Sequence, residues 1–294
     1  MFTSPSPELP EGTKVIFGDR SNEYGVWYTR DIEYARPQPN GTPLYIQLLH
    51  PTPNASRMPF PLLIYIQGSA YFEQNCYCSL PLLTDIARAG YVIASVKHRS
   101  SDVAKSPAFL VDVKTAIRFL RKNAAEYNID PNRFAIMGES SGGHISSMVG
   151  VSEDVADFET EEYGEYSSGV QAVVDIFGPS DITKFFDTIP RKEPFEDHPT
   201  ARLIGGLPED YPERAQQINP MKYLDENKTI PPFLILHGDS DGSVPFNQSV
   251  LLYEALRKHK KQVTFYKVLG AEHGRFLRSK TLMDIVIAFL GAYV

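Results

Sequence analysis

The chain has 294 residues, of which 42% are hydrophobic and 22% are charged, and this composition excludes a largely disordered protein. Its 29 basic and 36 acidic residues give a net charge of −7, which argues against a general affinity for nucleic acid or anionic membranes. The length fits either one α/β domain or two smaller domains.

The ends of the chain and its cysteines bear on the compartment. The N-terminal residues lack the basic and apolar regions of a signal peptide, and no stretch approaches the roughly 20 apolar residues of a transmembrane helix. Cys76 and Cys78 are separated by one residue, a spacing that strains a disulfide and predicts two reduced thiols in a loop. We therefore expect a cytoplasmic protein without stable membrane insertion, with a processed secreted form as the alternative.

The hydrophobic pattern of the first half predicts strands and helices in alternation. The predicted strands are residues 26–35, 44–49, 62–66 and 91–96, and the last two are continuous apolar runs typical of strands buried on both faces. Residues 80–89 fit a helix that ends at Gly90. Pro107 begins a long amphipathic helix, which is followed by a turn at residues 130–132.

The second half continues the alternation. The predicted strands are residues 133–137, 171–177, 232–236 and 263–268, and the predicted helices are residues 141–151, 248–258 and a C-terminal helix that holds Ile285, Phe289 and Leu290. Apolar strands that alternate with helices indicate an α/β fold, with a mostly parallel twisted sheet covered by helices on both faces.

Two stretches interrupt the alternation. Residues 152–169 contain seven acidic residues and no basic one, which predicts a solvated loop. Residues 178–230 are Pro-rich and aromatic, and they are too long for an ordinary connection. We interpret this second stretch as a cap or lid inserted in a single domain that spans residues 1–294.

Gly138-Glu139-Ser140-Ser141-Gly142 is a Gly-x-Ser-x-Gly motif between a predicted strand and a predicted helix. A serine on such a tight turn is forced out of the sheet, and the positive end of the following helix points at the charge that develops there. This context predicts Ser140 as a nucleophile. Ser141 is the rival hydroxyl, but it is offset by one position from the motif.

A serine hydroxyl needs a base, and seven histidines are candidates. His273 directly follows the strand 263–268, so it lies at the sheet edge that also carries Ser140. His144 sits one helical turn after Ser140, which favours a packed residue, and His237 ends a strand. The remaining histidines, among them His198, have no such context. We therefore predict His273 as the base.

The base needs a carboxylate to fix its tautomer, and the loop after the strand 232–236 offers two. Asp239 immediately follows Gly238 and is expected to cap that turn. Asp241 lies deeper in the loop and is the predicted acid. The chain order Ser140, Asp241, His273 is that of α/β-hydrolases. Backbone N–H groups in the turn after strand 62–66, together with that of Ser141, are candidates for binding a tetrahedral oxyanion.

Together these motifs resemble the α/β-hydrolase superfamily across essentially the whole chain. Within it, the chain is similar to hormone-sensitive-lipase-like carboxylesterases and to bifunctional feruloyl/acetylxylan esterases. The resemblance is carried by residues 67–71, by the helix 112–123 with residues 127–131, and by residues 138–144, 177–181, 237–245 and 270–274. By position, the oxyanion donors of the family fall on the backbone of Ser69, Ala70 and Ser141. The lipase-like members carry His-Gly-Gly-Gly where this chain has Gln67-Gly68-Ser69-Ala70, which argues against bulky or tertiary-alcohol esters as substrates.

The resemblance implies a serine carboxylesterase that needs neither an organic cofactor nor a metal. It implies short acyl or hydroxycinnamoyl esters, such as feruloyl, chlorogenate or acetylated sugar esters, as small-molecule substrates. Tyr71, Phe72, Phe177 and Phe185 are candidates for stacking on a planar acyl group, as are Tyr77, Phe186 and Phe195. An amide hydrolase of the same fold, arylformamidase or peptidase-like, is the alternative, and an inactive binding protein is a third reading. A homodimer is allowed for, and nucleic acid is not expected as a partner.

Overall fold

The computed structural model describes residues 9–15, 24–38, 41–52, 59–188, 190, 195–274 and 279–294. Within these residues, eight strands form one sheet in the order β1-β2-β4-β3-β5-β6-β7-β8. The strands are β1 Val26–Ala35, β2 Leu44–Pro51, β3 Phe60–Ile66, β4 Val92–Val96, β5 Ile129–Glu139, β6 Ala172–Ile176, β7 Phe233–Gly238 and β8 Val263–Val268. β2 is antiparallel to both β1 and β4, and all neighbours from β4 to β8 are parallel. The predicted α/β class with a mostly parallel sheet is confirmed.

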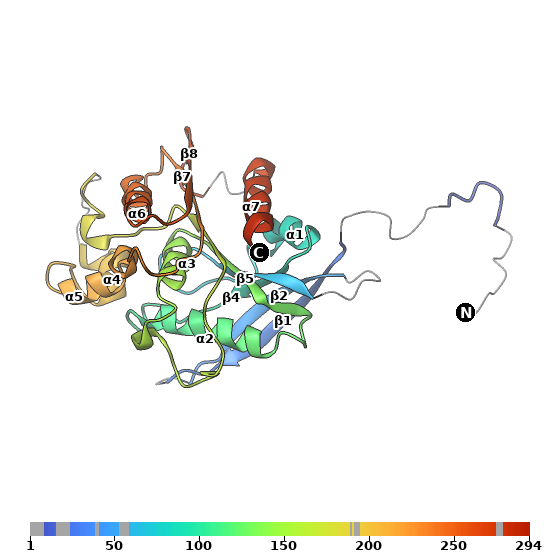
Figure 1. The fold of residues 1–294 in the computed structure, drawn as a ribbon, viewed down its shortest axis with the longest axis horizontal. Helices are drawn as coiled ribbons and strands as arrows, with labels where there is room; N and C mark the ends of the chain where they lie inside the picture. The colour runs from blue at the N-terminus through green and yellow to red at the C-terminus, as the bar shows by residue number, and fades with distance from the viewer. Residues whose placement is uncertain are drawn as a thin grey trace.

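Helices cover both faces of the sheet (Figure 1). The helices are α1 Leu80–Arg88, α2 Ala108–Lys122, α3 Ser141–Val151, α4 Pro199–Ile204, α5 Pro212–Gln217, α6 Asn247–Lys258 and α7 Lys280–Tyr293. α1 and α7 pack in one hydrophobic cluster, whereas α2, α3 and α6 contribute to the other. Within the described residues, no helix combines the length and the apolar character needed to cross a membrane.

The central strands are apolar at nearly every position because each face of the sheet is buried. In β3, Leu62 and Ile64 belong to the cluster of α2 and α3, and Leu63 and Tyr65 belong to the cluster of α1 and α7. Side chains alternate between the faces of a strand, so a strand covered on both sides needs a continuous apolar run. This explains why these strands were predictable from the sequence.

One predicted turn lies inside a strand instead. Residues 130–132 belong to β5, which begins at Ile129. The pairing with β3 runs from Phe60 opposite Ile129 to Leu62 opposite Phe134, so the register shifts across the predicted turn. Asp130 accepts a hydrogen bond from the Asn132 N–H at 3.0 Å, which gives the turn-like local pattern. The turn signal therefore marks an irregularity at the start of β5 rather than the end of a connection.

The predicted solvated loop at residues 152–169 is confirmed for six of its seven acidic residues, which are exposed, whereas Glu159 is partly buried. Glu159 of this loop forms ion pairs with Lys114 and Arg118 of α2, and Lys114 Nζ lies 2.6 Å from Glu159 Oε1. The Lys114 side chain is fully buried, and its Nζ also donates to the Ser152 carbonyl at 2.6 Å. A buried cation requires such partners. The charge of the loop alone did not reveal this pairing of Glu159 with basic residues of α2.

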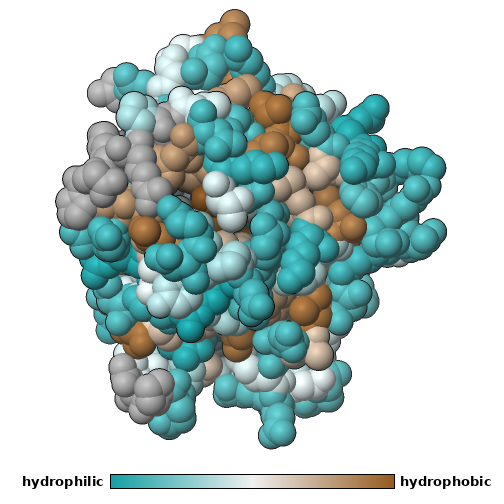
Figure 2. All heavy atoms as spheres, turned by 90° about the vertical axis from the view of Figure 1, so that its left-hand side faces the viewer, coloured by the Kyte–Doolittle hydropathy of each residue, from teal (hydrophilic) through white to brown (hydrophobic). Residues whose placement is uncertain are grey.

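The segment 178–230 connects β6 to β7 and contains no strand among its described residues. Besides α4 and α5, it holds the short 3₁₀ helices Ile182–Lys184, Phe195–Asp197 and Pro220–Tyr223. Figure 1 shows α4 and α5 at the end of the molecule where α6 also lies. Figure 2 shows this side as mostly hydrophilic, with hydrophobic side chains in separate patches rather than in one continuous band.

Candidate active site

Ser140 stands alone between β5, which ends at Glu139, and α3, which begins at Ser141. Its backbone has φ 54° and ψ −124°, a region that side chains rarely adopt and that costs about 1–3 kcal/mol. The turn closes because Gly142 has no side chain: a Cβ at that position would lie 2.0 Å from the carbonyl oxygen of Ile66. The strained turn therefore sets the Ser140 side chain at the C-terminal edge of the parallel strands.

A chain of two hydrogen bonds begins at this serine. Ser140 Oγ lies 3.2 Å from His273 Nε2, and His273 Nδ1 lies 2.7 Å from Asp241 Oδ2. His273 follows β8, and Asp241 follows β7, so the three residues come from three loops at one sheet edge. The structure therefore brings together the three residues that the sequence nominated for the nucleophile, the base and the acid.

Asp241 is held as a carboxylate by its surroundings. Its side chain is fully buried, and Oδ1 accepts hydrogen bonds from the N–H groups of Ser243 at 2.8 Å and Val244 at 2.9 Å. Oδ2 also lies 3.3 Å from His237 Nε2. Burial by itself would raise the pKa of Asp241, but the hydrogen bonds from His237, His273 and the backbone outweigh it and hold that pKa well below its usual range. The carboxylate thus stays charged beside His273.

Asp239, the rival carboxylate, has a different task. Its Oδ1 accepts a hydrogen bond from the Gly270 N–H at 2.7 Å, and its Oδ2 lies 3.3 Å from Lys267 Nζ. It ties the loop after β7 to the turn after β8, rather than capping its own turn after Gly238 as expected. His237 is buried behind Asp241, where its Nδ1 lies 2.7 Å from Ser249 Oγ, a contact that the sequence did not indicate.

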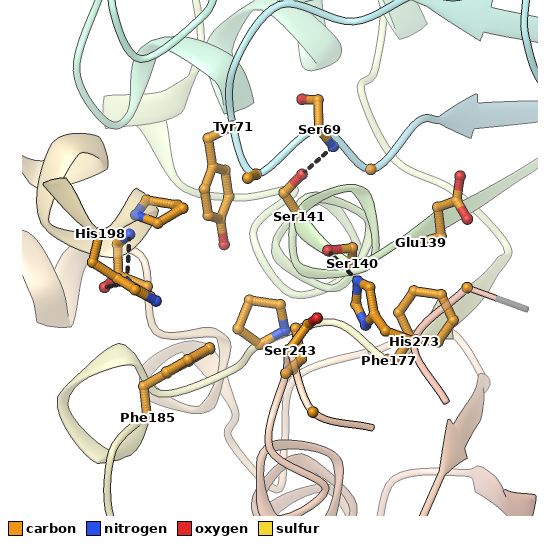
Figure 3. A pocket seen from close by; sticks show the side chains of 18 of the residues that line it. Ser69, Tyr71, Glu139, Ser140, Ser141, Phe177, Phe185, His198, Ser243 and His273 are labelled. Atoms are coloured by element: carbon orange, nitrogen blue, oxygen red, sulfur yellow. Dashed lines mark hydrogen bonds between the residues drawn. The ribbon is translucent and has the colours of Figure 1, made fainter. Parts of the chain in front are cut away.

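The loop after β3 passes directly beside Ser140. A Cβ on Gly68 would lie 2.6 Å from the Glu139 carbonyl oxygen, so only glycine fits there. Ala70 and Tyr71 both have positive φ, 52° and 65°, and turn the loop into the site. The Ser69 N–H, a predicted oxyanion donor, donates to Ser141 Oγ at 3.0 Å (Figure 3). Ser141, the rival hydroxyl, thus binds the loop rather than His273.

A cavity of about 570 Å³ opens above Ser140. Ser140 and His273 line it together with the loop after β3, with Ser243 from the loop after β7 and with residues of the segment 178–230. The residues from that segment are Pro179, Phe185, Phe186, Pro190, His198, Pro199 and Thr200. Most of them are apolar or aromatic, whereas the polar groups gather around Ser140. Such a cavity, apolar with a few convergent polar groups, is typical of a small-molecule site.

The structure separates the aromatic residues singled out in the sequence. Tyr71, Phe177, Phe185 and Phe186 line the cavity. The Phe177 ring lies 4.5 Å from the His273 ring, centroid to centroid, and therefore packs against the candidate base.

Three other aromatic residues are not among those that line the cavity. The Phe72 ring lies 5.1 Å from the Arg202 guanidinium carbon. Tyr77 is 51% exposed and donates a hydrogen bond to Asp31 Oδ1 at 2.5 Å. Phe195 is buried and stacks on the ring of His198.

His144, the rival histidine on α3, is fully buried. Its Nδ1 lies 2.8 Å from the Tyr71 hydroxyl and its Nε2 lies 2.6 Å from the Ile218 carbonyl oxygen. Nε2 must donate to that carbonyl, and in the neutral ring that burial favours, Nδ1 accepts from the Tyr71 hydroxyl. Burial lowers the pKa of His144 to about 4. This residue links the loop after β3 to the segment 178–230, in line with the packed role expected for it.

Sequence reasoning missed His198 and Thr200 at the start of α4. The sequence placed His198 among histidines without context, yet it lines the cavity. A signal was present in His198-Pro199-Thr200, because proline at the first position of a helix marks the residue before it as the cap. The described residues contain no cluster of three or more His, Cys, Asp or Glu side chains arranged to hold a metal ion. Cys76 and Cys78 are both free, the first buried and the second exposed.

The model of the BD-FAE family matches residues 49–256 of this chain, which include Ser140 and Asp241. The chain belongs to the BD-FAE family. Two solved structures support the assignment of this BD-FAE protein to the α/β-hydrolase fold. A truncated carbohydrate esterase from gut microbiota is 32% identical with a TM-score of 0.82, over 92% of this chain and 97% of that one. A bifunctional GH43-CE protein of Bacteroides eggerthii is 34% identical with a TM-score of 0.81, over 90% of this chain and 38% of that one.

A curated relative of this BD-FAE protein is also an esterase by name. Esterase LipC of Mycobacterium tuberculosis is 29% identical over 218 residues, which are 74% of this chain and 53% of LipC. The BD-FAE chain thus spans about half the length of the curated relatives it matches. Its kinship with serine esterases of the α/β-hydrolase superfamily agrees with the resemblance that the sequence motifs carried.

Proposed function

We propose that this BD-FAE protein is a serine carboxylesterase in which Ser140, His273 and Asp241 form the catalytic triad. The observation that carries the proposal is the hydrogen-bond chain from Ser140 Oγ through His273 to the buried Asp241, at the floor of the cavity. The names of the similar proteins, carbohydrate esterase and esterase, support the same reaction class.

In the proposed reaction, Ser140 Oγ attacks the ester carbonyl carbon while His273 Nε2 takes the hydroxyl proton. The tetrahedral intermediate collapses, His273 gives the proton to the leaving alcohol, and the acyl group stays on Ser140. Water then attacks the acyl carbon while His273 Nε2 takes its proton. The second tetrahedral intermediate collapses, the bond from Ser140 Oγ to the acyl group breaks, His273 returns the proton to Ser140, and the carboxylic acid leaves. Asp241 keeps the N–H of His273 on Nδ1, so that Nε2 is free to accept, and stabilises the imidazolium that forms.

The N–H groups of Ser69, Ala70 and Ser141 are the proposed donors to the oxyanion. In the structure the Ser69 N–H is bound by Ser141 Oγ at 3.0 Å. A substrate oxyanion would replace this hydroxyl, which turns away as the intermediate forms. Loss of one such donor typically reduces the rate about 10²–10³-fold.

The proposed substrates are short acyl or hydroxycinnamoyl esters, including feruloyl, chlorogenate and acetylated sugar esters. The aromatic lining of Tyr71, Phe185 and Phe186 supports a planar acyl group. The carbohydrate esterase named among the similar structures supports an alcohol of the sugar class.

A substrate panel tests the proposal. It contains p-nitrophenyl acetate and butyrate, methyl ferulate, chlorogenate and acetylated xylose, with N-formylkynurenine as the amide. The unaltered protein should hydrolyse the esters, and a fluorophosphonate should label Ser140, as located by mass spectrometry of the peptide. Turnover of the amide alone would favour an amide hydrolase, and labelling absent from Ser140 with no turnover would reject the triad.

A further inference from the structure

His198 is anchored so that one edge of its imidazole is left for the cavity. It precedes α4 as the N-cap residue, and its Nδ1 accepts a hydrogen bond from the Thr200 N–H at 3.3 Å. The Thr200 hydroxyl lies 2.8 Å from the same nitrogen. Because a backbone N–H can only donate, Nδ1 is an acceptor, and the hydrogen of the neutral ring sits on Nε2.

The ring is also fixed in orientation by its neighbours. The Phe195 ring stacks on it at 5.4 Å with an interplanar angle of 10°, and the Phe186 ring meets it edge-on at 4.9 Å. The Phe185 ring lies 5.3 Å away. Burial lowers the pKa of His198, which agrees with a neutral ring. Among the described residues, no acceptor is paired with Nε2, and Figure 3 shows the imidazole at the cavity wall.

The cavity wall around His198 offers no competing donor among its described side chains. The Tyr71 hydroxyl is committed to His144 Nδ1, and the Thr200 hydroxyl to His198 itself. Phe185, Phe186 and Pro199 have no polar side-chain atom. Among the described side chains of this part of the lining, the His198 N–H is therefore the donor that remains for a ligand.

The orientation of the ester at Ser140 directs its acyl group towards the part of the cavity lined by His198, Tyr71 and Phe185. The leaving alcohol must receive its proton from His273 Nε2, so the alcohol leaves on the His273 side of Ser140. The carbonyl oxygen points at the oxyanion amides, and the acyl substituent takes the remaining direction. In Figure 3, His198, Tyr71 and Phe185 lie on the opposite side of Ser140 from His273.

We infer that His198 is a specificity-determining residue whose Nε2–H donates a hydrogen bond to an oxygen at the far end of an aromatic acyl group. The acyl group that fits is a planar ring with an oxygen substituent. The ring would pack against Phe185 and Phe186, and its oxygen would accept the hydrogen bond from His198. This inference rests on the proposed esterase function and adds the part of the substrate that the wall would recognise.

The test compares methyl 4-hydroxycinnamate with methyl cinnamate, which differs by that one oxygen. The ratio of their kcat/KM values is measured in the unaltered protein and in His198→Asn. Asparagine still caps a helix N-terminus, so α4 keeps its cap while the imidazole N–H is lost. The ratio should fall about tenfold in the variant, as expected for one neutral hydrogen bond. Intrinsic ester reactivity cancels because each ratio is compared with the same ratio in the parent.

His259→Asn is the matched control, because His259 directly follows α6 and is not among the residues that line the cavity. It should keep the parental ratio. An equal ratio in the parent and in His198→Asn, with both esters hydrolysed, would overturn the inference while leaving the esterase function intact. Absence of ester turnover together with unlabelled Ser140 would instead remove the proposed function.

A second measurement avoids variants altogether. Methyl 4-methoxycinnamate keeps the acceptor oxygen but has no hydroxyl hydrogen. If His198 donates, the unaltered protein should still prefer this ester to methyl cinnamate. A rate reduced to that of methyl cinnamate would show that the phenolic group acts as a donor, and the assigned direction of the bond would be wrong.

Discussion

The floor and the wall of the cavity are built in different ways. The floor, which we define as Ser140, His273 and Asp241, comes from loops that directly follow the parallel strands β5, β8 and β7. The wall, which we define as Tyr71, Phe185, Phe186 and His198, comes from the loop after β3 and from a segment without strands. The sheet therefore positions the proposed catalytic residues, whereas the choice of substrate depends on packing between distant segments. Variants of the floor should therefore affect every substrate, and variants of the wall should change the ratio between substrates.

The largest effect is expected for Ser140→Ala. Because the triad acts as a unit, loss of the nucleophile should reduce kcat/KM for each ester by roughly 10⁶-fold. The rates are measured with p-nitrophenyl acetate and methyl ferulate, and the melting temperature reports whether the fold is retained. If one ester kept a near-normal rate, the floor would not serve all substrates alike.

Asp241→Asn should reduce kcat/KM by about 10⁴-fold. The amide N–H can donate to His273 Nδ1, which moves the ring hydrogen to Nε2 and leaves no acceptor for the Ser140 proton. Asp239→Asn is the matched control, because Asp239 binds the Gly270 N–H and Lys267 rather than His273. The two variants are compared by steady-state kinetics on one ester. If kcat/KM fell by similar factors in the two variants, the assignment of Asp241 as the acid of the triad would be rejected.

The floor was predictable from the sequence for a physical reason. Ser140 stands in a glycine-flanked turn, and Asp241 stands just beyond β7, which is apolar at nearly every position. His273 follows β8, a half-exposed strand that includes Thr264 and Lys267. Parallel strands bring their C-terminal ends to one edge, so the order of motifs along the chain is enough to assemble the site.

The aromatic part of the wall was predictable, because Tyr71, Phe185 and Phe186 were among the aromatic candidates. His198 was not, because it reaches the cavity through the packing of a segment that has no periodic pattern.

The ion pairs of Glu159 in the acidic loop were missed for the same reason. Its partners Lys114 and Arg118 lie on α2, and neither the acidic pattern of the loop nor the hydrophobic pattern of α2 predicts that the two meet. Contacts between distant segments depend on tertiary packing. The local pattern of a single sequence shows that a residue is charged or apolar, but not which distant residue it contacts.

His144 links the loop after β3 to the segment 178–230, and its burial predicts a pH dependence of stability. Its pKa is about 4 in the folded protein and about 6.5 in the unfolded chain. Between these values the unfolded chain binds the proton and the folded protein does not, so the free energy of unfolding falls as the pH falls. Over this range the loss should approach about 3 kcal/mol.

Urea unfolding at several pH values between 4 and 7 measures this loss. His144→Gln cannot take up a proton, so its free energy of unfolding should depend less on pH across the same range. His259→Gln is the control and should keep the parental slope. If the free energy of unfolding of His144→Gln depended on pH as it does in the parent, groups other than His144 would govern acid unfolding.

The smallest effect is expected for Phe186→Ala, and it tests the wall directly. The Phe186 ring lines the cavity and packs on His198, so its loss removes both an aromatic contact for the acyl group and a support for the donor. An aromatic pair contributes about 0.5–1.5 kcal/mol beyond burial, which corresponds to a change of up to about tenfold. The ratio of kcat/KM for methyl ferulate over p-nitrophenyl acetate should fall by this factor. In Phe119→Ala, which alters α2 outside the cavity lining, the ratio should stay at the parental value. A Phe186→Ala variant that slowed both esters equally would assign this residue to the floor, because a selective wall must distinguish a planar aromatic acyl group from acetyl.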